Sequence, residues 1–283
     1  MKKRLSKLVT LLTVAILVAG TVVGCGTGGN TDKENSSKLN GQITLAGSTS
    51  MQKVAEGLKE GLMAANPNVT VTVEYNGSSA GVEQLLAGSV QIGNASRNLK
   101  DTEKTDGAVE NIIAIDGIAV IIDKENSVSE ITTEELVKIY TGEIKNWSEL
   151  GGTDSPITVV GREPGSGTRG AFEELLDIED QCAYAQELDS TGTVLATVAA
   201  TEGAIGYVSL DVIDDSVTVV KLDGVEATEA NIVSGAYGLC RPFVMATKGT
   251  VEEQNELVQA FFAYIESEEG QAIIKQVGLI LPN

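Results

Sequence analysis

The chain has 283 residues, 42% of them hydrophobic, which is enough to bury the cores of two domains of ordinary size. It contains no histidine, so the commonest general base and the commonest ligand of transition metals are absent. Its formal net charge of −20 repels nucleic acid, and no nucleic-acid partner is expected. A site for a small anion must therefore act locally, within about one Debye length of ~8 Å.

The first 24 residues combine a basic start with an apolar run. Four basic residues precede an almost wholly apolar stretch over residues 8–23, which ends at Gly24 and Cys25. This pattern is typical of a lipoprotein signal peptide over residues 1–24, after which Cys25 carries the lipid (diacylglyceryl and palmitate). The alternative is a transmembrane anchor with an incidental cysteine, although the run is short for a span. The polar stretch that follows predicts a flexible tether, so that residues 25–39 would hold a folded domain at the extracytoplasmic face of the cell membrane.

Strand-like and helix-like segments alternate after the tether. Apolar or alternating runs predict strands over residues 42–46, 69–75, 90–92, 112–122, 157–161, 204–208 and 217–222. Helical periodicity and capping patterns predict helices over residues 51–65, 82–87, 132–140, 167–176, 193–200 and 250–276. This alternation indicates an α/β fold with two largely parallel sheets flanked by helices.

Two stretches, residues 115–119 and 239–243, could cross between two lobes. We therefore expect lobe 1 to comprise residues 40–116 with 240–283, and lobe 2 to comprise residues 117–239, with a ligand cleft between them.

Three loops share one design, a serine- and glycine-rich turn between a strand and a helix. A helix start has unpaired N–H groups and a partial positive charge, glycine allows close approach, and hydroxyl groups add donors. One such loop can be a simple helix cap, but loops that follow successive strands converge on one crevice and favour an anion site. The loop positions expected to contact an anion are Ser48, Thr49 and Ser50; Ser78 and Ser79; and Ser166, Gly167 and Thr168.

Arg162 precedes the third loop by four residues. A guanidinium there could hold a tetrahedral oxyanion with two hydrogen bonds, and the alternative is a salt bridge at the surface or between lobes. The stretch Gly77-Ser78-Ser79-Ala80-Gly81 also fits the G-x-S-x-G pattern of serine hydrolases, but the chain has no histidine to act as the base. No phosphate-binding loop of nucleotidases occurs in the sequence.

With these loops, four more segments carry a family resemblance: Tyr75-Asn76 before Gly77, the run over residues 92–97, the run over residues 139–147, and Ala204-Ile205-Gly206-Tyr207-Val208. From about Asn40 to Pro282 the sequence resembles the phosphate-binding proteins of Pst-type ABC importers, in the short, lipid-anchored form of Gram-positive bacteria. The resemblance implies a type II periplasmic-binding-protein fold that closes on inorganic phosphate. It also implies a monomer that delivers phosphate to permease subunits of the PstC and PstA type with a PstB-type ATPase, without enzyme activity, metal or cofactor.

The resemblance also implies which residues bind phosphate. Long-form members have an aspartate at the position of Arg97, and this aspartate accepts the proton of hydrogen phosphate. Here Arg97 would add a positive group or pair with a carboxylate, so the acceptor must lie elsewhere. We expect Asp116, with Glu163 as the second choice; the alternative for Asp116 is a turn residue before Gly117. The expected phosphate-binding set is Ser48, Thr49, Ser50, Ser78, Ser79, Ser96, Arg97, Arg162, Ser166, Gly167 and Thr168.

Some alternatives stay open at this point. Cys182 and Cys240 can form a disulfide outside the cytoplasm, or stay as two buried thiols. The same fold could bind another oxyanion, such as sulfate, molybdate or phosphonate. More distant alternatives are a serine-based hydrolase or phosphatase and a surface adhesin or signalling lipoprotein.

Overall fold

The computed structural model describes residues 39–282. The expected signal peptide, the lipidated Cys25 and nearly all of the tether lie outside these residues. Among the helices of residues 39–282, none combines the length and the apolar character that a membrane span requires.

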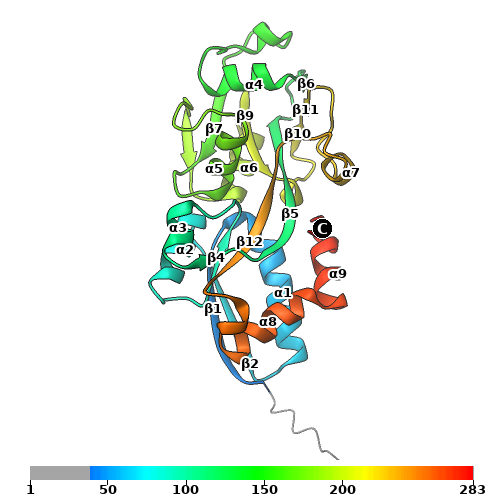
Figure 1. Cartoon of the computed structure of the whole chain (residues 1–283). Helices are drawn as coiled ribbons and strands as arrows, with labels where there is room; N and C mark the ends of the chain where they lie inside the picture. The colour runs from blue at the N-terminus through cyan, green and yellow to red at the C-terminus, as the bar shows by residue number, and fades with distance from the viewer. Residues whose placement is uncertain (1–38, 283) are drawn as a thin grey trace, which may run out of the picture. The chain divides into compact units, whose positions relative to one another are not determined.

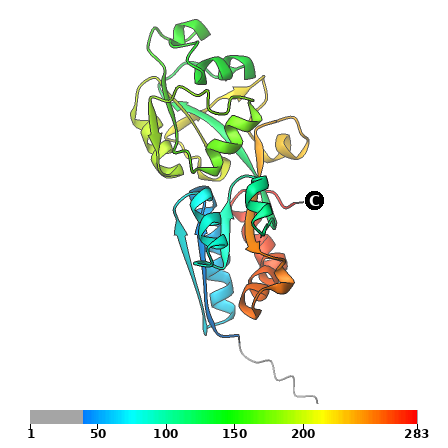
Figure 2. The same cartoon turned by 60° about the vertical axis from the view of Figure 1, so that its left-hand side comes forward.

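Lobe 1 is built around three parallel strands, with segments from the two ends of the chain side by side (Figure 2). We use the name lobe 1 for the residues that pack around these three strands. Its strands are β1 (Gly41–Gly47), β2 (Val69–Tyr75) and β3 (Ile92–Ala95), and its main helices are α1 (Gln52–Ala65), α2 (Ser78–Leu86), α8 (Glu256–Glu266) and α9 (Glu268–Gln276). A short helix α3 (Asp101–Thr105) and a two-residue strand β4 (Ala108–Val109) complete it.

Lobe 2 surrounds a second parallel set of strands. In this set, β7 (Thr158–Arg162) pairs with β8 (Gln186–Leu188) on one side and with β9 (Ala204–Ser209) on the other. Its helices are α4 (Thr133–Tyr140), α5 (Gly167–Leu175), α6 (Thr191–Ala200) and α7 (Glu229–Val233), and its minor strands are β6 (Glu130–Ile131), β10 (Val217–Val219) and β11 (Lys221–Leu222).

Two long strands run from one lobe to the other (Figure 1). They are β5 (Ile112–Asp123) and β12 (Cys240–Lys248), which pair antiparallel with a register shift between Phe243 and Val244. Because β12 also pairs with β3 and β5 also pairs with β9, the strands form one sheet in the order β2-β1-β3-β12-β5-β9-β7-β8. The expected two separate sheets are therefore joined into one mixed sheet.

The apolar core changes along each crossing strand. On β5, Ala114 packs in the core of lobe 1 and Ile118 in the core of lobe 2. On the other crossing, Leu239 belongs to the core of lobe 2 and Phe243 to that of lobe 1. Both proposed lobe boundaries, after Asp116 and after Leu239, fall within these intervals, and they remain a proposal.

Several elements differ from their prediction. The long C-terminal helix is divided into a 3₁₀ turn (Val251–Glu253), α8 and α9, because Asn255 and Ser267 each cap a new helix start with their side chains. Strand β5 continues through Asp116 and Gly117, so Asp116 is a strand residue and not the turn residue that was the alternative for it. Helix α2 begins at Ser78, four residues before the predicted start at Val82. By contrast β2 has the predicted bounds, and Thr132 forms the predicted capping box at the start of α4.

Of the two alternatives for the cysteines, the structure has the free thiols, since Cys182 and Cys240 are not bonded to each other. Cys182 follows α5, and its thiol lies 3.9 Å from the carbonyl oxygen of Ile178. Cys240 begins β12, opposite Gly117 on β5. Burial raises the pKa of the Cys182 thiol to about 11 and also raises that of Cys240, so both stay protonated at neutral pH.

Asp211, just beyond the end of β9, is a carboxylate without a hydrogen-bond donor. Both of its oxygens are buried, and neither has a hydrogen-bond partner within normal geometry. Burial, together with the negative charge of Asp116, raises the pKa of Asp211 to about 6. The nearby hydroxyl of Ser209 and the cations Lys53 and Arg241 oppose this rise in pKa without reversing it, and Lys53 donates to the backbone oxygen of Asp211 at 2.6 Å.

We predict that Asp211→Asn stabilises the protein near neutral pH. A carboxyl whose pKa is raised on folding favours the folded state below its unfolded value of 3.8, and this contribution is lost as the pH rises through about 6. The variant should gain about 3 kcal/mol of unfolding free energy at about pH 7.5 and little at about pH 3.5, as measured by urea unfolding. Asp215→Asn, a change of an exposed aspartate in the same loop, is the control and should differ little from wild type at either pH. An Asp211→Asn gain that is equal at both pH values would contradict the prediction.

Candidate anion-binding site

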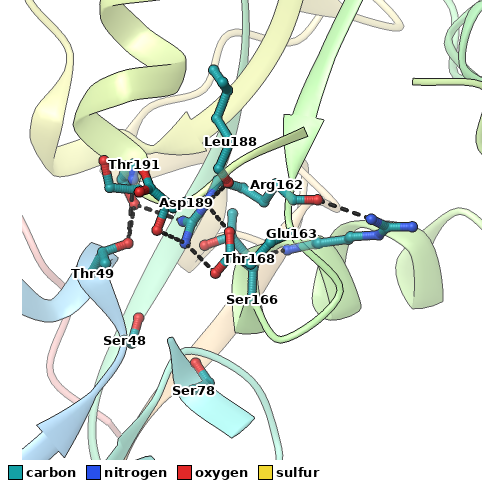
Figure 3. Close-up of polar contacts among 12 residues, drawn as sticks. Ser48, Thr49, Ser78, Arg162, Glu163, Ser166, Thr168, Leu188, Asp189 and Thr191 are labelled. Atoms are coloured by element: carbon teal, nitrogen blue, oxygen red, sulfur yellow. Dashed lines mark hydrogen bonds and ion pairs between the residues drawn. The ribbon is translucent and has the colours of Figure 1, made fainter. Parts of the chain in front are cut away.

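Four hydroxyl side chains from the two lobes meet in one buried cluster. Figure 3 labels three of them, Thr49, Thr168 and Thr191. Thr49 and Ser50 follow β1 in lobe 1, whereas Thr168 and Thr191 lie at the starts of α5 and α6 in lobe 2. Ser50 Oγ lies 2.8 Å from both Thr168 Oγ1 and Thr191 Oγ1, and Thr49 Oγ1 lies 3.1 Å from Thr191 Oγ1. None of the four residues is more than 8% exposed. We call these four residues the hydroxyl cluster.

Three more serines of lobe 1 extend this arrangement. Ser48 Oγ donates to Ser96 Oγ at 2.8 Å, and the backbone N–H of Ser96 donates to Ser78 Oγ at 3.1 Å. Each is at most 3% exposed. The ends of β1 and β3 and the start of α2 are therefore held together through Ser96.

The hydroxyls lie at helix starts, as the sequence predicts. Ser48 caps the first turn by accepting from the N–H of Ser50, and Ser166 caps α5 by accepting from the N–H of Arg169. Gly77 precedes α2 with a φ of 94°, a conformation that glycine adopts without strain. These helix starts present N–H groups and partial positive charge toward an anion.

Arg162 reaches the hydroxyl cluster with one nitrogen. Its Nη1 donates to Thr191 Oγ1 at 3.1 Å, while its Nε and Nη2 each donate to the carboxylate of Glu163 at 2.9 Å (Figure 3). The carbonyl oxygens of Leu188 and Asp189 also accept from Nε and Nη2. The Nε and Nη2 edge of the guanidinium, which was expected to hold an anion, is therefore paired with Glu163. Arg162 forms this salt bridge and at the same time contacts the hydroxyl cluster through Nη1.

Two hydrogen bonds hold the backbone of Arg162 in place. Its N–H donates to Tyr207 Oη at 3.3 Å, and its carbonyl accepts from Arg169 Nη1 at 3.0 Å. The hydroxyl of Tyr207 lies 3.0 Å from that of Tyr184. The position of Arg162 therefore depends on both α5 and β9.

Arg97 is paired with a carboxylate. Its two Nη atoms donate to Glu103 at 2.7 and 2.8 Å, and one also donates to Ser79 Oγ at 3.3 Å. Ser79 in turn donates its N–H to the carbonyl of Gly165 across the lobes at 3.1 Å. These contacts lead away from the hydroxyl cluster, so Arg97 and Ser79 support the loops next to it.

The contacts of Asp116 argue against the expected role of proton acceptor. One oxygen accepts from Arg241 Nε and Nη2, and the other accepts from Ser209 Oγ at 2.8 Å. Burial raises the pKa of this carboxyl, and the contacts with Arg241 and Ser209 oppose that change. Both oxygens are already engaged, which leaves no free acceptor for the proton of a ligand.

Close approaches between loops explain two glycines. A Cβ on Gly167 would lie 2.3 Å from Ser78 Oγ and 2.7 Å from Ser96 Oγ, across the two lobes. A Cβ on Gly81 would lie 2.3 Å from the carbonyl oxygen of Ala46, so this glycine of the G-x-S-x-G pattern allows α2 to pack against the end of β1. Ser78 itself contacts Ser96, not a base, which agrees with a binding role rather than a nucleophilic one.

Thr191 is the member of the cluster that sequence reasoning missed. Its helix was expected to begin at Thr193, yet α6 begins at Thr191 with Ser190 as its cap. The stretch Ser190-Thr191-Gly192-Thr193 has the same composition as the three predicted loops and follows a strand, and this signal could have identified it. Among the described residues no group of three or more cysteine or acidic side chains could hold a metal ion.

Two lobes joined by two crossing strands, with hydroxyl-rich helix starts meeting between them, define the class of two-lobed solute-binding proteins. The sequence pattern of the PBP superfamily domain matches residues 32–269. The phosphate-binding protein PstS of Bacillus subtilis is 35% identical over 290 residues, covering 99% of this chain and 95% of that protein. PstS of Borreliella burgdorferi is 27% identical over 84% of this chain and 89% of that protein. The chain belongs to the PBP superfamily and, within it, to the family of PstS phosphate-binding proteins, which are substrate-binding proteins and not enzymes.

Solved structures agree with this assignment. The crystal structure of a putative phosphate ABC transporter substrate-binding protein with bound phosphate from Clostridium perfringens is 42% identical with a TM-score of 0.83, covering 86% of this chain and 100% of that chain. An ABC-type phosphate transport receptor from Vibrio cholerae is 32% identical with a TM-score of 0.72, over 86% of this chain and 100% of that chain. The expected type II periplasmic-binding-protein fold is confirmed.

We predict that Gly167→Ala keeps the lobes apart. The added methyl group would overlap Ser78 and Ser96, and two short side chains cannot both turn away without losing their mutual contacts. Small-angle scattering in phosphate should give a larger radius of gyration than for wild type. Gly192→Ala, where a Cβ would meet no atom within 4 Å, is the matched control and should scatter like wild type. Identical scattering of all three proteins would contradict the close approach.

Proposed function

We propose that this protein captures inorganic phosphate between its two lobes and delivers it to the permease of an ABC importer. The observation that carries the proposal is the hydroxyl cluster, to which each lobe contributes two side chains. A ligand that contacts both lobes at once stabilises the closed state, so binding and closure become one event. The PstS relatives and the phosphate-bound structure from Clostridium perfringens support phosphate as that ligand.

The proposed ligand contacts come from helix starts. The hydroxyls of Thr49, Ser50, Thr168 and Thr191 and one nitrogen of Arg162 would turn from one another to the phosphate oxygens. The N–H groups of Ser78 and Gly167, the first residues of α2 and α5, would add further donors. Micromolar affinity needs about −8 kcal/mol, and hydrogen bonds to a charged group contribute ~1.5–3 kcal/mol each. Several such bonds therefore suffice without a metal ion.

Selectivity among oxyanions rests on a separate argument. Hydroxyl groups accept hydrogen bonds as well as donate them, so the cluster can receive the proton of hydrogen phosphate. Both oxygens of Glu163, the second-choice carboxylate, accept from Arg162, so Glu163 would have to give up one of these contacts to accept the ligand proton. Sulfate, which has no proton at neutral pH, is the second candidate ligand that this arrangement leaves open.

The test is a calorimetric titration of the mature domain after unfolding and refolding to remove bound phosphate. We expect saturable phosphate binding with a dissociation constant of about 1 µM or below, as the free-energy estimate allows. Competition with sulfate across about pH 5 to 8 separates the two ligands, because only phosphate changes its protonation there. Absence of phosphate binding at millimolar concentration would refute the proposal.

A matched pair of threonines tests the site within the same experiment. Thr191→Val removes a hydroxyl from the cluster and should weaken phosphate binding by about tenfold or more, equivalent to ~1.5 kcal/mol or more. Thr193→Val changes the same helix at an exposed position whose hydroxyl lies near Ser190, and should leave the affinity within about twofold of wild type.

The location of the protein is also part of the proposal. The basic start, the apolar run and Cys25 support an extracytoplasmic lipoprotein held at the cell membrane. Cys25→Ser should release the protein from the membrane fraction into the soluble fraction during cell fractionation, with unchanged phosphate binding. Retention of the variant in the membrane at the wild-type level would favour the transmembrane-anchor alternative.

A further inference from the structure

A buried ion pair lies where the two crossing strands meet. Arg241 on β12 and Asp116 on β5 are cross-strand partners, and Nε and Nη2 of the arginine donate to the same carboxylate oxygen at 3.1 and 2.9 Å. Arg241 is 3% exposed and Asp116 is 1% exposed. The guanidinium also lies over the ring of Phe243, 5.3 Å from its centroid.

The third nitrogen of Arg241 reaches the site in lobe 1. Its Nη1 donates to the carbonyl oxygen of Ser96 at 3.1 Å. Ser96 links the side chains of the Ser48 loop and of the start of α2, because it accepts from Ser48 and donates its N–H to Ser78. Arg241 therefore holds a residue whose hydroxyl and N–H join these two site loops, and none of the hydrogen bonds described for Arg241 reaches the hydroxyl cluster itself.

The other oxygen of Asp116 is bound from lobe 2. Ser209 Oγ donates to it at 2.8 Å, and Ser209 ends β9, which pairs with β5. A continuous chain of hydrogen bonds thus runs from Ser96 through Arg241 and Asp116 to Ser209. This chain passes across the strands at which the lobes would move relative to each other.

Such a pair is not explained by stability alone. Removing two charges from water costs as much as their attraction returns, and apolar side chains of similar size often stabilise a core equally well. An ion pair of this kind can instead specify one arrangement of the groups around it. Here the ion pair would specify the position of Ser96 at the end of β3 and, through Ser96, the positions of the Ser48 and Ser78 hydroxyls.

We propose that Arg241 is a positioning residue for anion binding. Held by Asp116 between the crossing strands, it fixes Ser96 so that the lobe 1 serines keep the geometry that the ligand requires. The inference rests on the proposed phosphate binding, and it assigns a role to a residue that does not contact the ligand. A purely structural role would lower the melting temperature of variants and leave the affinity of the folded protein unchanged.

The test compares affinity and stability in the same samples, by phosphate calorimetry and by thermal unfolding of the mature domain. Arg241→Lys keeps a positive charge beside Asp116, but a single ammonium cannot reproduce the planar fork that reaches both Asp116 and Ser96. We expect Arg241→Lys to weaken phosphate binding about tenfold or more while the protein remains folded at the temperature of the titration. A loss of less than about threefold would overturn the proposal, and larger losses support it.

A pair of buried aspartates on β5 provides the control. Asp116→Asn weakens the hold on Arg241, whereas Asp123→Asn changes a carboxylate that accepts from the N–H of Gly203 and has no link to Ser96. Both should lower the melting temperature, but only Asp116→Asn should lower the affinity, by about fivefold or more. Equal affinity losses would overturn the proposal. This pair also decides the question should Arg241→Lys not fold.

The two proposals fail in different ways. If wild-type protein does not bind phosphate, the proposed function fails, and the positioning role of Arg241 fails with it. If wild-type protein binds phosphate and Arg241→Lys binds it equally well, the function stands and the positioning role is refuted.

Discussion

The contact between hydroxyl groups of the two lobes is the interaction on which the rest of the structure depends. Ser50 of lobe 1 lies within hydrogen-bond distance of Thr168 and Thr191 of lobe 2, and none of these hydroxyls is open to solvent. Such contact requires strand ends and helix starts from distant parts of the chain to converge. The loops, the glycine at position 167 and the crossing strands can all be understood as conditions for that convergence.

A second constraint is electrostatic. The chain carries a net charge of −20, and each buried arginine near the site has its own carboxylate: Arg97 with Glu103, Arg162 with Glu163 and Arg241 with Asp116. An anion between the lobes therefore meets no unpaired cation among these three. In the proposed site its charge would be balanced by one nitrogen of Arg162 and by the dipoles of hydroxyls and helix starts, which act over short distances and are strong where water is excluded.

Much of this arrangement could be predicted from sequence, because the signals are local. The alternation over residues 69–75 and the capping box at Thr132 lie within single segments, and the three hydroxyl loops follow strands in the same way. The pairing of Arg241 with Ser96 could not be predicted, since 145 residues separate them and only the folded sheet brings them together. The break between α8 and α9 was missed because Ser267 is compatible with a helix interior by composition, and tertiary packing determines that it caps a new helix instead.

The position of β12 also has a consequence for how the chain acquires its structure. This strand comes from near the C-terminus, yet it lies between β3 and β5 in the sheet, so lobe 1 is incomplete until the end of the chain is available. Pairing over such sequence separations is slow, because a long segment must close before any contact is gained. A nascent chain would therefore hold lobe 1 unfinished until synthesis ends, and its folding would be a late event of biogenesis. If the chain crosses a membrane before it folds, as the expected signal peptide implies, this delay is an advantage.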